Sequence, residues 1–311
     1  MHLGHQRVMA EVVDDNRISS DIYATVVTFS PHPQAYFSGI SKPLLTPIEE
    51  KAQQLSDIGI RQLVTLPFNA SLAALSPQEF VEDILVQGLQ AQRISVGSDF
   101  RFGKGRSGDA QGLKEIAAKF DVPVVLVPLK AEKGDRISSS RIRNALQNGE
   151  LSEATRLLGR PYTLSGTVVK GKQLGRTIGF PTANLQVSSE KFLPRTGVYS
   201  VWVYQGDRAQ QQETLSGDVT NQALSQPRVS KGVMNIGHRP TVDGQALSIE
   251  AHLLDWEGDL YGQTITVSLE SFIRSEQKFD SLEALKSQIV KDCETAKEVL
   301  GNRPSAPYIS V

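Results

Sequence analysis

The chain has 311 residues, of which 39% are apolar and 22% charged, the length and composition of about two soluble globular domains. Its 33 basic and 34 acidic residues leave a net charge of −1, which excludes an overall electrostatic attraction to nucleic acid or to an anionic membrane. Cys293 is the only cysteine, so an intramolecular disulfide is impossible. No apolar run is long enough to cross a membrane, and no signal peptide pattern opens the chain. We expect a cytoplasmic protein with small-molecule ligands.

The first half of the chain has the pattern of an α/β domain. Short, β-branched and nearly continuous apolar segments predict buried parallel strands at residues 22–29, 60–66, 93–97 and 123–128. Helices are predicted between them, because Thr46-Pro47-Ile48-Glu49 and Ser76-Pro77-Gln78-Glu79 each offer a hydroxyl N-cap, a proline at N1 and a glutamate at N3. Gly59 and Gly88 are the predicted stops of these helices.

From Tyr162 onward, apolar and polar residues alternate, as in Ile265, Val267 and Leu269 against their neighbours, which predicts an antiparallel barrel or sandwich. A closing helix is expected from Asp280 or Ser281 to about Leu300. Its apolar stripe should cover one side of the barrel, and consists of Leu282, Leu285, Ile289, Cys293, Ala296 and Leu300. Residues 205–230 are expected to form a long surface loop. Glycine and proline at 159–161 place the domain boundary between 1–159 and 160–311.

Three side chains of the second half could serve phosphoryl transfer. Thr182 and Asn184 lie two residues apart, so in an extended segment both point to one side and could share a Mg2+ ion. On the strand 247–254, Glu250 falls on the face opposite the apolar residues and could orient and deprotonate an alcohol. Taken alone, a threonine and an asparagine in this pattern are more often turn caps, and a strand glutamate is more often simply solvated.

Glycines near these residues could admit phosphates. Gly171, Gly175 and Gly179 would let the backbone approach a phosphate closely, and Arg176 adds positive charge. The lysine and hydroxyl pair of a Walker A loop is absent, so ordinary turns remain the alternative.

Several segments together resemble the bacterial bifunctional riboflavin kinase/FAD synthetase family, nearly from end to end. Those in the second half are Gly166–Gly171, Leu174–Leu185, Gly197–Tyr199, Gly232–Thr241 and Glu250–Gly262. The resemblance implies that Thr182 and Asn184 hold Mg2+ and the terminal phosphates of ATP, and that Glu250 is the catalytic base for the riboflavin 5′-hydroxyl. His252 is then a structural residue, while Asn235 and Arg274 are candidate flavin or nucleotide contacts.

In the first half, His2-Leu-Gly-His5 resembles the His-x-Gly-His signature of nucleotidylyltransferases, in which imidazoles stabilise charge on the triphosphate. Ile137–Arg143 resembles the second signature of the family, which implies that Ser139, Ser140 and Arg143 hold the same phosphates. The segments 28–33, with His32, and 97–103, with Asp99, line the FMN and ATP sites in the family. Asp99 and the pair Phe100 and Phe102 could also simply pack a loop.

The family implies a Rossmann-like nucleotidylyltransferase domain and a mainly β domain, a Greek-key-like barrel with a C-terminal helix. Relatives have a strand and a glycine-rich turn before His-x-Gly-His, whereas this sequence opens at Met1-His2. We therefore expect a truncated first domain with two exposed strand ladders, riboflavin kinase activity and weak FAD synthesis. Alternatives are a kinase with a non-catalytic first domain, or a flavin-binding sensor or carrier without turnover. The sequence does not define the oligomeric state.

Overall fold

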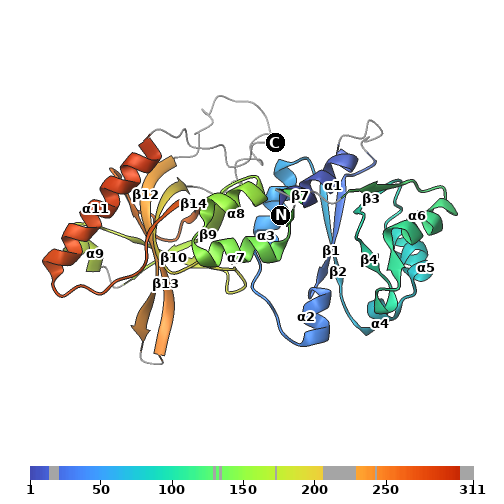
Figure 1. The fold of residues 1–311 in the computed structure, drawn as a ribbon, viewed down its shortest axis with the longest axis horizontal. Coiled ribbons are helices and arrows are strands. Elements are labelled where there is room, and N and C mark those ends of the chain that lie inside the picture. Colours follow the sequence, from blue (N-terminus) through green and yellow to red (C-terminus); the bar gives the residue numbers. More distant parts are fainter. Residues whose placement is uncertain are drawn as a thin grey trace. The chain divides into compact units, whose positions relative to one another are not determined.

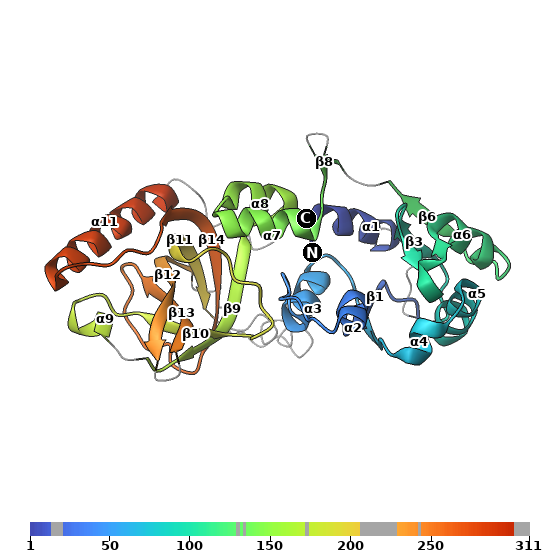
Figure 2. The ribbon, with the colours of Figure 1, turned by 60° about the horizontal axis from the view of Figure 1, so that its bottom comes forward.

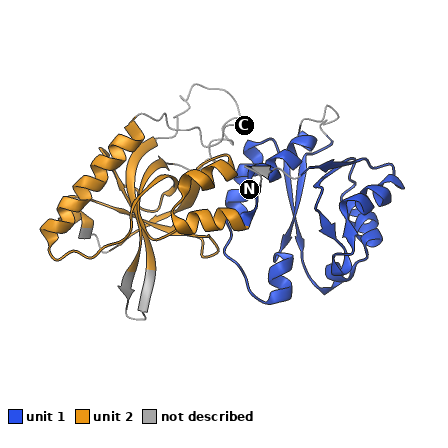
Figure 3. Ribbon diagram, viewed as in Figure 1, with its two compact units in different colours: residues 1–139, 311 blue, residues 140–310 orange. Residues whose placement is uncertain are grey.

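The computed structural model describes residues 1–13, 21–128, 131–132, 135–171, 174–205, 229–241 and 244–301 (Figure 1). The chain divides into two compact units, Met1–Ser139 and Ser140–Ser310, which are described separately (Figure 3). The surface loop predicted at residues 205–230 lies outside the described residues except at its ends.

The first unit alternates helices and strands, as the sequence predicts. Its parallel strands are β1 (Thr25–Ser30) with β2 (Gln62–Pro67), and β3 (Ile94–Gly97) with β6 (Val124–Val127). The main helices are α1 (Leu3–Val13), α2 (Pro33–Ser38), α3 (Ile48–Asp57), α4 (Ala70–Ala74), α5 (Pro77–Glu79), the π-helix η1 (Phe80–Gly88) and α6 (Ala110–Ala118). Short pieces complete it: β4 (Arg101–Phe102), η2 (Lys104–Arg106), β5 (Gly108–Asp109), β7 (Ala131–Glu132) and β8 (Asp135–Arg136). The four predicted strands and their parallel pairing are confirmed.

The parallel sheet of this unit is divided into two pairs. Within the described residues, β1 pairs only with β2 and β3 pairs only with β6, so both β1 and β3 have an open edge. Every residue of β3 and all but the last of β1 are half-buried, and only the two ends of β6 are fully buried. The prediction of fully buried strands is therefore wrong, because a strand with one neighbour keeps its other side open.

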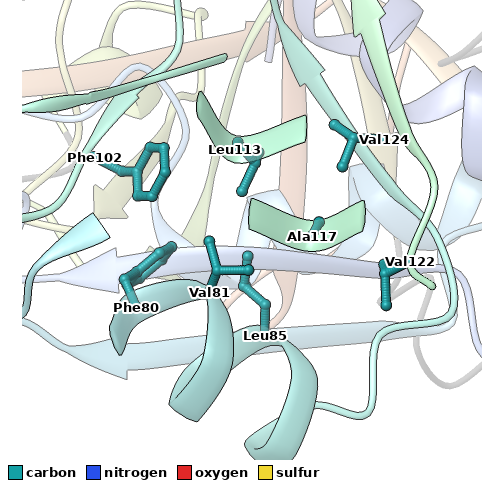
Figure 4. Close-up of a cluster of buried hydrophobic side chains, with 8 residues drawn as sticks. All are labelled: Phe80, Val81, Leu85, Phe102, Leu113, Ala117, Val122 and Val124. Atoms are coloured by element: carbon teal, nitrogen blue, oxygen red, sulfur yellow. The ribbon is translucent and has the colours of Figure 1, made fainter. Parts of the chain in front are cut away.

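Two apolar clusters hold the first unit together. Met9 of α1 is buried with Ala24, Leu55 and Ile60, so α1 and α3 share a core. The second cluster lies between η1, α6 and the start of β6 (Figure 4), and consists of Phe80, Val81, Leu85, Phe102, Leu113, Ala117, Val122 and Val124. The Ser95 hydroxyl of β3 donates to the Val8 carbonyl at 2.8 Å, which ties α1 to β3.

Of the two predicted N-terminal caps, the one of α5 is present and the one of α3 is not. Ser76 and Glu79 form a complete capping box at the start of α5, and the π-helix ends at Gly88 as predicted. The prediction that Thr46 caps α3 is wrong. The helix begins at Ile48, so Pro47, whose side chain has no acceptor, occupies the N-cap position, and the Thr46 hydroxyl accepts a hydrogen bond from the Met1 amino group at 3.1 Å. Gly59 ends α3 with φ +86°, as expected.

The second unit is a closed antiparallel barrel with the strand order β10-β13-β12-β11-β14-β9 (Figure 2). The strands are β9 (Tyr162–Val169), β10 (Ala183–Val187), β11 (Gly197–Gln205), β12 (Val229–Thr241), β13 (Gly244–Leu253) and β14 (Thr264–Arg274). The alternating pattern left a barrel or a sandwich open, and the barrel is confirmed. Its interior includes Leu164, Val201, Met234, Ala251 and Val267, all fully buried.

Four helices accompany the barrel: α7 (Ser139–Asn148), α8 (Leu151–Leu158), α9 (Leu174–Thr177) and α11 (Leu282–Gly301). Contacts of α8 with β9 and β14 group α7 and α8 with the barrel, whereas the sequence analysis drew the boundary after residue 159. Ala296 and Leu300 of α11 pack on Val198 and Trp202, as the apolar stripe predicts, while Leu282 is exposed. No helix in the described part of the chain is long and apolar enough to span a membrane.

Candidate active sites

The outer face of the barrel carries Glu250 between two asparagines. Ile249 and Ala251 are buried in the interior, so Glu250 points to the other side of β13. In the register of the sheet, Glu250 lies directly opposite Asn184 of β10 and directly opposite Asn235 of β12. Residues in this relation have their side chains on the same face within about 5 Å of each other. One carboxylate and two amides therefore form a row across three strands.

Thr182 joins this row from the segment before β10. Its hydroxyl donates to Glu250 Oε2 at 3.3 Å, and Asn184 is 9% exposed. The structure thus brings together Thr182, Asn184 and Glu250, the three residues on which the kinase prediction depends. A hydroxyl, an amide carbonyl and a carboxylate are oxygen ligands of the kind that Mg2+ prefers. Within the described residues, no group of three or more His, Cys, Asp and Glu is placed to hold a metal ion.

Two of the predicted phosphate-site glycines lie close against these residues. A Cβ on Gly171 would stand 2.6 Å from Asn184 Cγ, and one on Gly175 would collide with the Phe180 carbonyl. Only glycine fits at either position without a shift of its neighbour. Gly179 has φ +92° and is exposed, so it serves the turn after α9. Arg176, in α9, is exposed to solvent.

His252 lies two residues after Glu250 on the same face of β13. Its Nδ1 is 2.8 Å from the Pro181 carbonyl oxygen, and its ring meets the Phe180 ring edge-on at 5.6 Å. A structural role for His252 stays a prediction, and its two contacts both reach a neighbouring segment. That segment is the one that ends at Thr182.

The guanidinium of Arg274 forms hydrogen bonds within the second unit. It donates three hydrogen bonds to the Asp292 carboxylate, at 2.7 to 3.1 Å, and one to the Ser275 carbonyl. Asp292 is 3% exposed and also accepts a bond from Gln288. The contact of Arg274 with a flavin or nucleotide stays a prediction, whereas the contacts of its side chain join β14 to α11.

In the first unit, His2 and His5 stack at the start of α1 with ring centroids 3.8 Å apart. The pKa of His5 is lowered from 6.5 to about 3, mainly because the atoms around the ring keep water from it. The charges of His2, the N-terminus and Lys51 lower it further. Part of His5 is nevertheless open to solvent. The imidazole is therefore neutral at physiological pH, and an anion that reached it would favour its protonated form.

Lys51 of α3 is a candidate that the sequence analysis missed. Its Nζ lies 3.5 Å from the Thr28 hydroxyl of β1, and its charge acts on His5. Burial lowers the pKa of Lys51, and no acidic partner is paired with it in the described part of the chain. A lysine in a helix without a motif gives no signal in the sequence, and only the fold brings it beside the histidines.

The remaining predicted residues lie in loops and at helix starts. His32 caps α2, its Nδ1 accepting from the Gln34 amide at 3.1 Å, and Asp99 is exposed in the turn after β3. Phe102 is buried beside Phe80 in the core, so this aromatic residue packs the loop.

Ser139, Ser140 and Arg143 begin α7, where Ser140 and Arg143 belong to the second compact unit. A surface hollow of about 510 Å3 beside α3 and β2 contains none of the predicted site residues.

Comparisons with known proteins match both halves of the chain. A family model described as riboflavin kinase matches residues 158–300, and one described as FAD synthetase matches residues 1–141. Proteins named bifunctional riboflavin kinase/FMN adenylyltransferase are similar over most of their length. The Escherichia coli K12 protein is 38% identical over 97% of this chain and 90% of its own, and the Bacillus subtilis protein is 35% identical over the same shares. The Listeria monocytogenes protein is 36% identical over 94% and 87%.

A solved structure is also similar across both units. It has a TM-score of 0.77 and 30% identity over 97% of this chain and 91% of its own, and is described as a macrolide-efflux protein from Streptococcus pneumoniae. That description differs from the names of the relatives, which agree with each other and with both family models. The likeness to this structure concerns the fold of both units.

Proposed function

The chain belongs to the family of bifunctional riboflavin kinase/FMN adenylyltransferases, and we propose that it converts riboflavin to FMN and FMN to FAD, using ATP in both steps. The second half phosphorylates riboflavin, and the first half transfers an adenylyl group to FMN with release of pyrophosphate. The observation that carries the kinase assignment is the row of Asn184, Glu250 and Asn235, with the Thr182 hydroxyl 3.3 Å from the carboxylate.

For the kinase step, Glu250 orients the riboflavin 5′-hydroxyl and accepts its proton as the oxygen attacks the γ-phosphate of ATP. Phosphoryl transfer depends mainly on position and on charge neutralisation, so one carboxylate in the right place suffices as the base. The partly exposed position of Glu250 on the outer face of the barrel supports this role, because a substrate can reach it.

Thr182 and Asn184 supply oxygen ligands for Mg2+, which when bound neutralises charge on the terminal phosphates of ATP. Gly171 and Gly175 let the chain pack closely against Asn184 and against the Phe180 carbonyl, and this packing positions the two proposed ligands. Arg176 is exposed nearby in the chain and adds positive charge, and Asn235 contacts substrate from the other side of Glu250.

For the adenylyl step, the stacked imidazoles of His2 and His5 and the ammonium group of Lys51 contact the triphosphate, whose negative charge favours protonation of the histidines. Phosphate binding by Ser139, Ser140 and Arg143 at the start of α7 is proposed from the family resemblance, as is the lining of the FMN and ATP sites by His32 and Asp99. We expect FAD formation to be the weaker activity, because in the described part of the first unit the parallel strands form two separate pairs with open edges. A single cysteine and the use of ATP fit action in the cytoplasm.

The test is a time course with purified protein, ATP and Mg2+, in which the flavins are separated. With riboflavin as substrate, FMN is expected first and FAD later and in smaller amount. With FMN as substrate, FAD and pyrophosphate are expected. A protein that makes FMN but never FAD would have a non-catalytic first half, and one that binds flavin without consuming ATP would be a sensor or carrier.

The metal is tested in the same assay. Removal of divalent cations with EDTA should abolish FMN formation, and added MgCl2 should restore it. A Thr182→Val variant should need a higher Mg2+ concentration for half-maximal rate, because one oxygen ligand is lost. An unchanged Mg2+ requirement would remove Thr182 from the metal site.

A further inference from the structure

His252 is connected to the catalytic row through the backbone of another segment. In the pairing of β10 with β13, Ala183 lies opposite Ala251 and Asn184 lies opposite Glu250. When this register is continued by one residue, Thr182 comes opposite His252. Glu250 and His252 are two residues apart on β13 and share its outer face. His252 therefore stands beside the same face as Thr182, at the end where the segment from α9 enters β10.

The hydrogen bond of His252 defines which ring nitrogen carries a proton. The Pro181 carbonyl oxygen can only accept, so the Nδ1 atom 2.8 Å away must be the donor. Nδ1 is protonated both in the corresponding neutral tautomer and in the imidazolium, so this bond exists in both charge states. A role that depends on this bond differs from acid or base catalysis, which would depend on pH.

The segment held by His252 leads from α9 directly to the site. After α9, the Phe180 amide donates to the Gly175 carbonyl at 2.8 Å, and Gly179 turns the chain with φ +92°. Phe180 then meets the His252 ring, Pro181 accepts its hydrogen bond, and the next residue is Thr182. Two side chains of β13 therefore hold this segment. His252 bonds the Pro181 carbonyl, and Glu250 accepts a hydrogen bond from the Thr182 hydroxyl.

We propose that His252 is a positioning residue of the kinase site, whose Nδ1–H bond to the Pro181 carbonyl holds the Thr182 hydroxyl in place against Glu250. This inference rests on the proposed riboflavin kinase function. Since Thr182 is the proposed ligand of Mg2+ and the ATP phosphates, loss of the bond should affect the use of ATP more than the binding of riboflavin. A displacement of a catalytic group by about 1 Å can cost on the order of 100-fold in rate.

The test compares two replacements of His252 that differ in one donor. His252→Phe keeps the ring against Phe180 and removes the donor, and should lower kcat/KM for ATP by about tenfold or more while the Kd for riboflavin changes by less than about twofold. His252→Asn places an amide N–H near the position of Nδ1 and should recover most of the loss. The pH profile of kcat should keep its shape in His252→Asn, because the bond does not depend on the charge of the ring.

Three results would overturn the proposal: wild-type ATP kinetics in His252→Phe, equal losses in both variants, or a change confined to riboflavin binding. A second measurement does not depend on activity. In protein labelled with 15N-histidine, the His252 signal, identified by its absence in His252→Asn, should show a protonated Nδ1. An Nε2–H tautomer would contradict the bond. If the wild-type protein formed no FMN, the kinase function itself would fail, while the tautomer would still be decided.

Discussion

The amide of Asn184 lies against the Cα of Gly171, so closely that a β-carbon there would stand 2.6 Å from Asn184 Cγ. Gly171 is the second residue after β9, and Asn184 is the second of β10, two strands that pair directly. The close contact fixes where the amide points, and hence which atoms it offers beside Glu250. The glycine is needed for this contact and not for its backbone angles, since its φ is not positive.

The substitution Gly171→Ala should therefore reduce kinase activity by displacing Asn184. We expect kcat/KM for ATP to fall by about tenfold or more, as for other displacements of a catalytic group. Gly301→Ala is the matched control, because nothing lies within 4 Å of a Cβ at that position. Steady-state FMN formation measures both variants, and equal rates in the two would show that the contact has no catalytic consequence.

The pair formed by Arg274 and Asp292 should contribute to stability and little to binding. In Asp292→Asn, the buried end of the bond network loses its charge, and the free energy of unfolding should fall by about 1–3 kcal/mol. Lys297→Met is the control, because the Lys297–Asp255 pair is exposed on both sides and such pairs stabilise little.

Urea unfolding gives the stability of each variant, and fluorescence quenching gives the riboflavin affinity. A large loss of affinity in Arg274→Lys with unchanged stability would return Arg274 to the flavin site. The predicted outcome is the reverse, because three of its bonds go to Asp292.

Cys293 should react slowly with thiol reagents. Burial, together with the negative charges of Asp292, Asp255 and Glu294, raises the pKa of this thiol to about 11 against the opposing effect of Lys297. The neutral thiol then dominates below this pKa, and only the thiolate reacts. The rate of alkylation by iodoacetamide should rise about tenfold per pH unit from pH 7.5 to 9.5. A rate that levels off near pH 8.5 would show an ordinary, exposed cysteine.

Lys51 should serve FAD synthesis alone. Replacing it by methionine removes a charge from the phosphate site, and FAD formation from FMN should fall by about 10–100-fold, the equivalent of one lost charge-assisted hydrogen bond. FMN formation from riboflavin in the same preparation is the internal reference and should be unchanged. Lys114→Met, at an exposed position of α6, is the matched control. Equal loss of both activities in Lys51→Met would indicate a general folding defect.

Local patterns in the sequence predict most of the second unit and the core of its site. Alternation over Ile265–Leu269 is enough to identify strands, and spacing by two residues is enough to place Glu250 and His252 on one face. The position of Asn235 opposite Glu250, by contrast, cannot be predicted from a local pattern. It depends on which strands pair and in what register, and no local pattern contains that information.

The first unit shows the same limit. The apolar segments predict β1, β2, β3 and β6 correctly, but the division of the sheet into two pairs leaves them half-buried. Thr46 has the residue type of an N-cap and bonds the Met1 amino group instead, which lies 45 positions away in the sequence. Lys51 becomes a candidate only through its distance to Thr28 and its effect on His5.

The most direct test of the account is the rate of FMN formation by Glu250→Gln, with riboflavin affinity measured on the same sample. The amide keeps the size of the side chain and removes the base, so kcat should fall by about 100-fold or more while the Kd for riboflavin stays within about threefold. Glu257→Gln, an exposed glutamate just after the same strand, should behave as wild type. Wild-type turnover in Glu250→Gln would contradict the assignment of this site.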